Sequence, residues 1–386
     1  MRQKIIALVD CDCFFVSCER VDRPDLNGRP VCVVTSDNNK GIVVSRSAEA
    51  KALGIKMGAP MFQIKDRYDG VHYIPVRHSR YGELSKQVMD VLRTFAPVVE
   101  EVSVDEAYMD LTGLSRVYKM TYRDLIMQIR QKVMDETGIP VSVGLGTSKT
   151  LAKLASDKAK TNGGIFIIPP DRIREMLANT ALEEVCGIGH QAAAQYGRKG
   201  IVSVGELLDK EVPWVRQAFG VNGERLRYEL AGVAVSAVNA LEEAPQSIQD
   251  TRALEDFTGS LELLQNTMAY HVHRASQKLR RWNGYCQTLA VMVRTKDFRM
   301  WEEEVRLEVA TNSEARLLKQ ARELLARMYK PKVLYRATGV TLKNLVYGEA
   351  VQESLFGEKV REDDKVSHLI DELEARFGRD IIRYGG

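Results

Sequence analysis

Apolar runs and amphipathic periods alternate along the first 165 residues of the chain. Short apolar runs between polar turns predict buried strands, and apolar residues spaced three and four apart predict helices. The predicted strands are residues 4–9, 31–35, 42–45, 103–111 and 141–145. The predicted helices are residues 48–53, 77–95, 121–137 and 148–160. The order strand–insert–helix–strand–strand–helix–strand–helix predicts an α/β (α+β) domain with an antiparallel-rich sheet rather than a Rossmann fold.

The second half of the chain continues this mixture of helices and strands after a linker. Residues 233–247 contain few aromatic side chains and include Pro245, which is typical of a linker. Beyond the linker, the pattern predicts a helix at 266–282, a strand at 289–294, a helix at 316–330, a strand at 340–345 and a short amphipathic helix at 366–377. No internal repeat or low-complexity tract interrupts it.

Length and composition narrow the class of protein. A chain of 386 residues predicts two to four domains. It has no run of 18 apolar residues and no cationic leader followed by an apolar segment, so we expect a cytoplasmic protein. The cysteines are scattered and lack zinc or redox spacing, which predicts reduced thiols and no zinc site; they are Cys11, Cys13, Cys18, Cys32, Cys186 and Cys286.

The net charge of +3 is unevenly distributed along the chain. Residues 250–347 contain 17 Lys and Arg against 11 Asp and Glu, whereas residues 348–386 contain 6 against 10. A basic module followed by an acidic tail indicates a nucleic-acid binder with a separate segment for protein contacts. Surface charge that only keeps the protein soluble would give similar counts.

Two predicted strands carry carboxylates where a core strand would be apolar. The first strand ends in Asp10, and Asp105 and Glu106 lie together in the strand and hairpin around 103–111. Neither segment has a basic residue nearby, so we expect the three carboxylates to converge and to bind a hard divalent cation that relieves their repulsion. Two such ions would hold a triphosphate. An acidic hairpin in solvent is the alternative for the Asp105–Glu106 pair taken alone.

The segments around these carboxylates resemble a known family. The Asp10 strand, VVSRSAEAKALGIKMGAP (43–60), SVDEAYMDLTG (103–113) and VGLGTSKTLAKLASDKAKTNGG (143–164) are similar to the Y-family DNA polymerases, and most similar to the UmuC branch, the catalytic subunit of polymerase V, among the relatives of DinB. The resemblance implies a right-hand polymerase with a palm (1–15 and 75–170), small fingers (16–74), a helical thumb (171–236), a linker (237–248), an α/β little finger (249–347) and an acidic tail (348–386).

The resemblance also implies roles for single residues. Asp10, Asp105 and Glu106 match the catalytic carboxylates, which with the carbonyl of Cys11 would bind two Mg²⁺ ions, Mn²⁺ being a substitute. Phe15 matches the aromatic steric gate that excludes a 2′-hydroxyl. The other residues expected to bind the dNTP are Phe14, Ser45, Arg46, Lys51 and Lys160, and Ala48 departs from a phosphate-binding Tyr of the DinB pattern. Lys149 and Lys153 are expected on a solvated helix face or against DNA.

Further segments fit contacts with DNA and protein partners. Gly187, Ile188 and Gly189 resemble the turn of a helix-hairpin-helix, whose backbone N–H groups bind a DNA phosphate. Gln352, Leu355 and Phe356, within residues 352–356, resemble the peptide that docks bacterial polymerases on the sliding clamp.

The branch implies UmuD-like and RecA-like accessory proteins and a place near the nucleoid, and small residues in the fingers favour synthesis across damaged templates. A catalytically inactive DNA-binding paralogue and, less favoured, a nucleotidyl cyclase with a palm are the alternatives.

Overall fold

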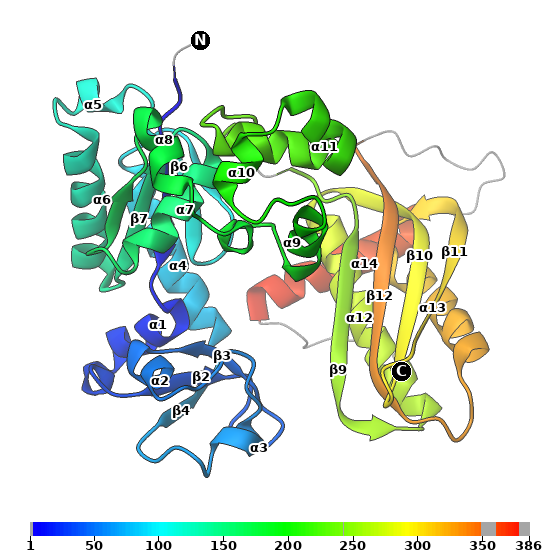
Figure 1. The fold of residues 1–386 in the computed structure, drawn as a ribbon. Helices are drawn as coiled ribbons and strands as arrows, with labels where there is room; N and C mark the ends of the chain where they lie inside the picture. The colour runs from blue at the N-terminus through cyan, green and yellow to red at the C-terminus, as the bar shows by residue number, and fades with distance from the viewer. Residues whose placement is uncertain (1–2, 242, 349–359, 378–386) are drawn as a thin grey trace. The chain divides into compact units, whose positions relative to one another are not determined.

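The computed structural model describes residues 3–241, 243–348 and 360–377 (Figure 1). Its chain divides into two compact units, residues 1–242 and 243–386. The finer division into palm, fingers, thumb and little finger stays a prediction. Within the described ranges, no helix is both long enough and apolar enough to span a bilayer.

A five-stranded sheet in the order β5-β6-β1-β7-β8 forms the centre of the first unit. Its first four strands run antiparallel to their neighbours, and only β8 pairs in parallel, so the predicted antiparallel-rich sheet is confirmed. The strands are β1 (Ile6–Cys11), β5 (Val99–Glu101), β6 (Glu106–Asp110), β7 (Val141–Gly146) and β8 (Ile165–Ile167). The central strand β1 is buried at every position, as its apolar sequence predicts.

Helices pack on this sheet and enclose the largest apolar core of the unit. They are α1 (Phe14–Asp22), α4 (His78–Arg93), α5 (Leu114–Val117), α6 (Tyr122–Thr137) and α7 (Lys149–Ala159). The boundaries of α6 follow its sequence: the Thr121 hydroxyl accepts from the Asp124 N–H at the start, and Gly138 adopts φ 71° at the end. The Ser148 hydroxyl caps α7 in the same way.

A small three-stranded sheet, ordered β3-β2-β4, is inserted between α1 and α4. Its elements are β2 (Val31–Val34), β3 (Val43–Arg46), β4 (His72–Pro75), α2 (Ala48–Ala52) and α3 (Met61–Ile64), and the short 3-10 helix η1 (Pro24–Leu26) precedes it. A separate apolar cluster, which includes Cys32, Ile55 and Met61, forms the core of this insert.

Short helices complete the first unit after β8. They are η2 (Pro170–Arg172), α8 (Ile173–Leu177), η3 (Leu182–Glu184), α9 (His190–Gly197), α10 (Val204–Leu208) and α11 (Val212–Leu230). They share an apolar cluster with α7, which includes Leu151 and Leu154, so α7 packs on the central sheet on one side and on these helices on the other.

The second unit is a four-stranded antiparallel sheet in the order β11-β10-β12-β9, with α12 and α13 packed on it. Its elements are β9 (Ile248–Thr258), α12 (Leu261–Arg281), β10 (Gly284–Thr295), β11 (Met300–Thr311), α13 (Glu314–Met328), β12 (Tyr335–Tyr347) and α14 (Val360–Phe377). The order β-α-β-β-α-β is that of a split βαβ fold. The sequence pattern predicts α12, α13, α14, β10 and β12 but misses β9 and β11.

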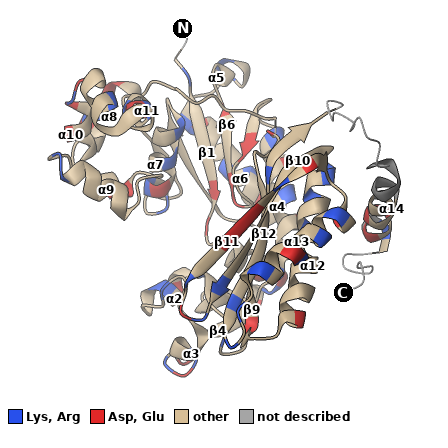
Figure 2. Ribbon diagram, turned by 90° about the vertical axis from the view of Figure 1, so that its right-hand side faces the viewer, with Lys and Arg blue, Asp and Glu red and all other residues tan. Residues whose placement is uncertain are grey.

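The basic surplus of the second unit is not spread over all its strands. Glu302, Glu303 and Glu304 make the edge strand β11 acidic, whereas Lys and Arg mark α12 and α13 (Figure 2). These glutamates pair with basic neighbours: Glu302 and Glu304 with Lys343, and Glu303 with Arg327.

Candidate active site

Asp10 and Glu106 face each other on adjacent antiparallel strands. Asp10 precedes the last residue of β1, and its backbone pairs with Glu106 of β6 on one side and with Ser142 of β7 on the other. Because residues paired in register project to the same face of a sheet, the two carboxylates come together. The Asp10 residue is only 4% exposed, so its charge needs a partner.

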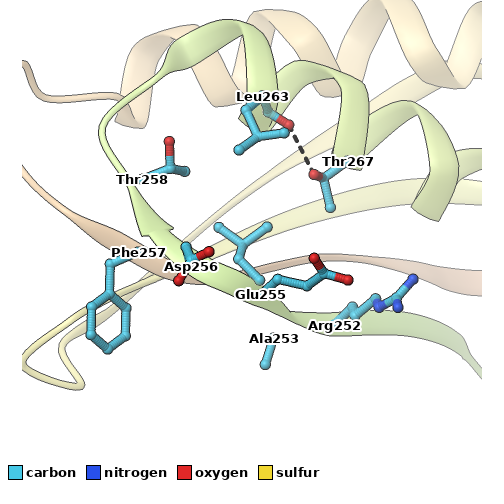
Figure 3. Close-up of a pocket in the computed structure, with 9 residues that line it drawn as sticks. Arg252, Ala253, Glu255, Asp256, Phe257, Thr258, Leu263 and Thr267 are labelled. Atoms are coloured by element: carbon cyan, nitrogen blue, oxygen red, sulfur yellow. Dashed lines mark hydrogen bonds between the residues drawn. The ribbon is translucent and has the colours of Figure 1, made fainter. Parts of the chain in front are cut away.

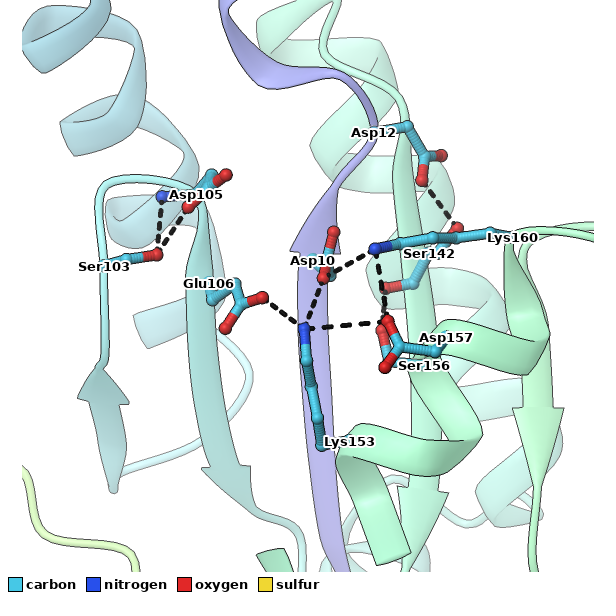
Figure 4. A network of polar contacts seen from close by, with 10 residues as sticks. All are labelled: Asp10, Asp12, Ser103, Asp105, Glu106, Ser142, Lys153, Ser156, Asp157 and Lys160. Carbon is cyan, nitrogen blue, oxygen red and sulfur yellow. Dashed lines mark hydrogen bonds and ion pairs between the residues drawn. The ribbon is translucent and has the colours of Figure 1, made fainter. Parts of the chain in front are cut away.

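Two lysines of α7 and the loop after it supply that partner (Figure 4). The Lys153 ammonium lies 2.9 Å from Oδ2 of Asp10 and also forms an ion pair with Oε1 of Glu106. The Lys160 ammonium lies 2.9 Å from the same Asp10 oxygen, and Asp157 lies 3.4 Å from Lys160. The site is therefore a compact network of alternating charges.

The lysines set the ionisation of the two carboxylates differently. Burial by itself would raise the pKa of Asp10, but Lys153 and Lys160 together outweigh it and lower this pKa. Glu106 pairs with only one lysine. Burial, helped by the negative charge of Asp10, therefore outweighs Lys153 and raises the pKa of Glu106. Burial opposes the charge on Lys153, yet Glu106 and Asp10 hold its pKa above the ordinary value. Lys153 is thus a cation at neutral pH.

Asp105 lies in the bend that precedes β6, and its backbone carbonyl accepts from the Cys11 N–H at 2.8 Å. Its carboxylate accepts a hydrogen bond from the Ser103 hydroxyl and is drawn beside Ser103 in Figure 4. We expected three carboxylates to converge. Two of them, Asp10 and Glu106, do so, whereas the side chain of Asp105 is turned to its own hairpin. The Ser103 hydroxyl supplies a hydrogen-bond donor to Asp105 within this hairpin, whereas the ammonium groups of Lys153 and Lys160 lie at Asp10.

One prediction about basic residues near the site is wrong. The carboxylates meet basic side chains from outside their own segments, because Lys153 and Lys160 are distant in sequence and close in space. Lys153 is not on a solvated helix face: its side chain is 14% exposed and directed at Asp10. Lys149, also on α7, pairs with Glu100 of β5, and its Nζ lies 2.6 Å from Oε2 of that glutamate. The helical period could have predicted that Lys153 and Lys160 act together, since residues seven apart lie on one face of a helix.

The donors near β1 suit a divalent cation. Carboxylate oxygens of Asp10, Glu106 and Asp105, with the carbonyl of Cys11, are the hard ligands that Mg²⁺ or Mn²⁺ takes. Among the described residues, no group of three or more His, Cys, Asp or Glu side chains is already arranged to hold a metal. The residues therefore fit the ion in chemical type, and Asp105 would have to turn toward the pair. The Asp12 carboxylate accepts from the Ser142 hydroxyl at 2.8 Å.

The two adjacent phenylalanines at the start of α1 have different surroundings. The Phe14 residue is 3% exposed and lies in the central core, so any contact of this residue with a nucleotide would have to come from its backbone. Phe15 is only partly buried and lies beside Tyr81 of α4. The Tyr81 hydroxyl donates to Oε1 of Glu19 at 2.7 Å, and Arg77 binds both oxygens of this buried carboxylate. Phe15 is therefore backed by a fixed aromatic ring.

Three more of the predicted nucleotide-binding residues lie in the small insert, on its strand β3 and its helix α2. Ser45 of β3 is buried, and the neighbouring Arg46 donates to the carbonyl of Ile55 within the insert. Lys51 is an exposed residue of α2. Of the six residues predicted to bind the nucleotide, Lys160 is the one that pairs with Asp10.

The predicted helix-hairpin-helix turn precedes a helix as expected. Gly189 is the N-cap of α9, and Gly187 has φ 90°, a value that favours glycine. Ile188 is buried in the apolar cluster of these helices, so any contact of this turn with a phosphate would have to come from its backbone. The predicted clamp-binding residues Gln352, Leu355 and Phe356 lie outside the described residues.

A shallow cavity of about 390 Å³ lies in the second unit, between the end of β9 and the start of α12 (Figure 3). Its lining residues are Arg252, Ala253, Leu254, Glu255, Asp256, Phe257, Thr258, Leu263 and Thr267. None of the predicted site residues belongs to it, so it is separate from the carboxylate pair.

Two family models match the chain. Residues 9–157 match the impB/mucB/samB family, and residues 245–355 match the C-terminal domain of the same family. The first match covers the carboxylate pair and Lys153, and the second covers the sheet of the second unit.

Individual relatives match over nearly the whole chain. Protein UmuC of Salmonella typhimurium is 32% identical, over 99% of this chain and 93% of that protein. DNA polymerase IV of Desulfatibacillum aliphaticivorans is 29% identical, over 99% of this chain and 96% of that protein.

Solved structures agree on the fold. A Y-family DNA polymerase chimera of Dbh and Dpo4 matches with a TM-score of 0.75 at 24% identity, over 89% of this chain and all of the other. An insertion ternary complex of Dbh DNA polymerase matches with a TM-score of 0.57 at 25% identity. The architecture is therefore that of a right-hand polymerase.

Proposed function

The chain belongs to the impB/mucB/samB family of Y-family polymerases, and from this membership we propose that it is a template-directed DNA polymerase. It adds dNTPs to a primer 3′-hydroxyl with low fidelity and copies past damaged template bases. The relatives named UmuC and DNA polymerase IV support this activity. A role in DNA repair and in damage-induced (SOS) mutagenesis in the bacterial cytoplasm, near the nucleoid, follows from it.

The observation that carries the proposal is the facing pair of Asp10 and Glu106 at the ends of paired strands. We assign the binding of two Mg²⁺ ions, for which Mn²⁺ can substitute, to Asp10, Glu106, Asp105 and the Cys11 carbonyl. Bound there, such ions supply activation of the primer 3′-hydroxyl and neutralisation of the triphosphate. Lys160 already lies at Asp10, from where its ammonium can bind the triphosphate of the incoming dNTP.

Sugar and base selection come from residues around this pair. Phe15 is the steric gate, since a partly exposed ring backed by Tyr81 can exclude a 2′-hydroxyl. Ser45, Arg46 and Lys51 are further dNTP contacts, together with the backbone of Phe14. Small residues such as Ala48 and Gly58 place little bulk in the inserted sheet, which suits a site that accepts a damaged base.

Contacts with DNA and partners lie outside this pair. The backbone at residues 187–189 binds a phosphate of the primer-template, and the basic helices of the second unit bind further along the duplex. Gln352, Leu355 and Phe356 dock the chain on a bacterial sliding clamp. UmuD-like and RecA-like accessory proteins remain part of the proposal because of the relationship to UmuC.

Primer extension tests the proposal. The wild type and Asp105→Ala/Glu106→Ala are compared with Mg²⁺ and dNTPs on an intact template and on one with an abasic site. We expect the wild type to extend on both templates and the double variant on neither. Asp110→Asn is the matched control, since Asp110 lies on the same strand but pairs with Lys4 at its far end.

The remaining outcomes separate the alternatives. DNA binding by fluorescence anisotropy, measured on each variant, shows whether a loss of extension comes from loss of the fold. Wild-type extension that stops at the abasic site would retain the polymerase and remove unaided bypass. DNA binding without extension on either template would instead identify a catalytically inactive DNA-binding paralogue.

A further inference from the structure

The Lys153 ammonium bridges the same two carboxylates that we assign to the metal ions. It lies 2.9 Å from Oδ2 of Asp10 and forms a second ion pair with Oε1 of Glu106. Its side chain is 14% exposed, and those of Asp10 and Glu106 are 6% and 25% exposed. Figure 4 shows the ammonium at the end of an extended side chain, between the two carboxylates.

The positive charge of Lys153 reduces the repulsion between the buried carboxylates of Asp10 and Glu106. Two carboxylates that face each other in a partly dry site repel, and each loses hydration. A single positive charge between them offsets both costs, as a divalent ion would. Because an ammonium and a metal ion would use the same carboxylate oxygens, they cannot both occupy the space between Asp10 and Glu106.

The ammonium also has an alternative location within reach. Lys153 is flexible beyond its Cβ, and Asp157 on the next turn of α7 lies 3.7 Å from its Nζ. The phosphates of a nucleotide at the site would offer a stronger anionic partner. Lys160 lies 2.9 Å from the same Asp10 oxygen but, unlike Lys153, it does not also pair with Glu106.

We infer that Lys153 is a resident counter-cation of the metal site and that a divalent ion must displace it in order to bind. This lowers the affinity of the free protein for the ion. It also couples ion binding to nucleotide binding, because the phosphates receive the displaced ammonium. Lys153 is thus a positioning residue that favours loading of ion and nucleotide together. The inference rests on the proposed function, since it takes Asp10 and Glu106 as metal ligands.

Binding of Mn²⁺ to the full chain, without DNA or nucleotide, tests the inference. Electron paramagnetic resonance counts free Mn²⁺ in titrations of the wild type and of Lys153→Met, which keeps the length of the side chain and removes its charge. We expect Lys153→Met to bind Mn²⁺ about tenfold more tightly, within the range by which neighbours of metal ligands alter affinity. Lys149→Met removes a charge from the same helix at Glu100 and should leave the affinity as in the wild type. Equal or weaker binding by Lys153→Met overturns the inference.

A measurement on the unaltered protein covers the case in which Lys153→Met does not fold. Reductive methylation followed by mass spectrometry reports the accessibility of each lysine. Mg²⁺ should increase the methylation of Lys153 severalfold while that of Lys149 stays constant; unchanged methylation of Lys153 at saturating Mg²⁺ also overturns the inference. Primer extension by the wild type separates the two proposals. Extension with no effect of Lys153→Met on Mn²⁺ binding removes the inference alone, whereas tighter Mn²⁺ binding without extension removes the polymerase alone.

Discussion

The ring of Phe15 stacks on the ring of Tyr81, with the ring centroids 4.5 Å apart and the planes 17° from parallel. Tyr81 is 1% exposed and is held in turn by its hydrogen bond to Glu19. The stack joins the first turn of α1 to α4, two helices on either side of the inserted sheet in sequence. The half-buried ring at position 15 therefore has a defined orientation.

Phe15→Ala should admit ribonucleotides. Removing the ring opens the space that a 2′-hydroxyl would otherwise occupy, so we expect the ratio of rNTP to dNTP incorporation to rise by at least about tenfold, or ~1.4 kcal/mol of discrimination. Single-nucleotide insertion kinetics measure this ratio. Phe15→Tyr keeps a flat ring and serves as the control. A ratio unchanged in Phe15→Ala would remove the steric-gate assignment.

Tyr81→Ala should destabilise the first unit and loosen Phe15. Loss of a fully buried ring costs about 3–5 kcal/mol of unfolding free energy, measured by urea denaturation. Tyr81→Phe keeps the ring and loses one hydrogen bond to a Glu19 that Arg77 still binds, so its cost is about 1 kcal/mol. In the same variant, sugar selectivity should stay near that of the wild type. Loss of sugar selectivity in Tyr81→Phe would show that the Tyr81 hydroxyl, and not the stacked ring, keeps Phe15 in place.

Gly144→Ala should push α7 off the sheet. A Cβ at Gly144 of β7 would lie 2.0 Å from the Ser156 backbone nitrogen and 2.3 Å from the Ala152 carbonyl oxygen. Backbone atoms cannot rotate away, so the cost is at least the ~1–3 kcal/mol of ordinary overpacking, and Lys153 moves with the helix. We expect a lower midpoint of thermal unfolding and a lower rate of primer extension. Gly82→Ala in α4 meets no atom within 4 Å and is the matched control, expected to be neutral or stabilising.

Docking of α14 on α12 should weaken as the pH rises. Nδ1 of His273 lies 2.9 Å from Glu314 and Nε2 lies 3.1 Å from Glu374 of α14, so these carboxylates raise the pKa of the imidazole. A folded-state pKa above the unfolded value of about 6.5 means that the stabilisation is complete below that pH and is lost as the pH rises through the raised pKa.

Amide hydrogen exchange of α14, compared as protection factors at pH 6 and pH 8.5, measures this change. Arg280 still pairs with Asp371 of α14 at either pH, with Nε 2.6 Å from Oδ2, so the helix should loosen without full release. His273→Gln has no charge to titrate, and its protection factors should not depend on pH. Equal protection of wild-type α14 at both values of pH would contradict the assignment.

Leu355→Ala/Phe356→Ala should abolish the effect of a sliding clamp. The expected result is unchanged extension by the polymerase alone and a loss of the long products that a loaded clamp allows, because the two apolar side chains would fill the clamp pocket. Product length on a primed circular template measures it. Val360→Ala, just beyond the motif, is the control. Long clamp-dependent products from the double variant would exclude this motif.

Local patterns were sufficient for much of the fold. Strand β1 is a continuous apolar run, and α6 has an apolar face with a Thr cap and a terminal Gly, so each appears in the structure near its predicted bounds. Strand β11 was missed because three successive glutamates conceal its alternation, and its exposed edge tolerates them. The position of Asp10 at the end of a buried strand marked the site without any knowledge of the sheet.

The sequence by itself determined the carboxylates, the aromatic pair at 14–15 and the family. Only the tertiary structure decided which cations neutralise those carboxylates, since Lys153 is 143 residues from Asp10. It also decided that Tyr81 backs Phe15 and that Asp105 turns to Ser103. The physical reason is that strand and helix periods depend on neighbours along the chain, whereas the charge and packing of a site depend on which elements the sheet brings together.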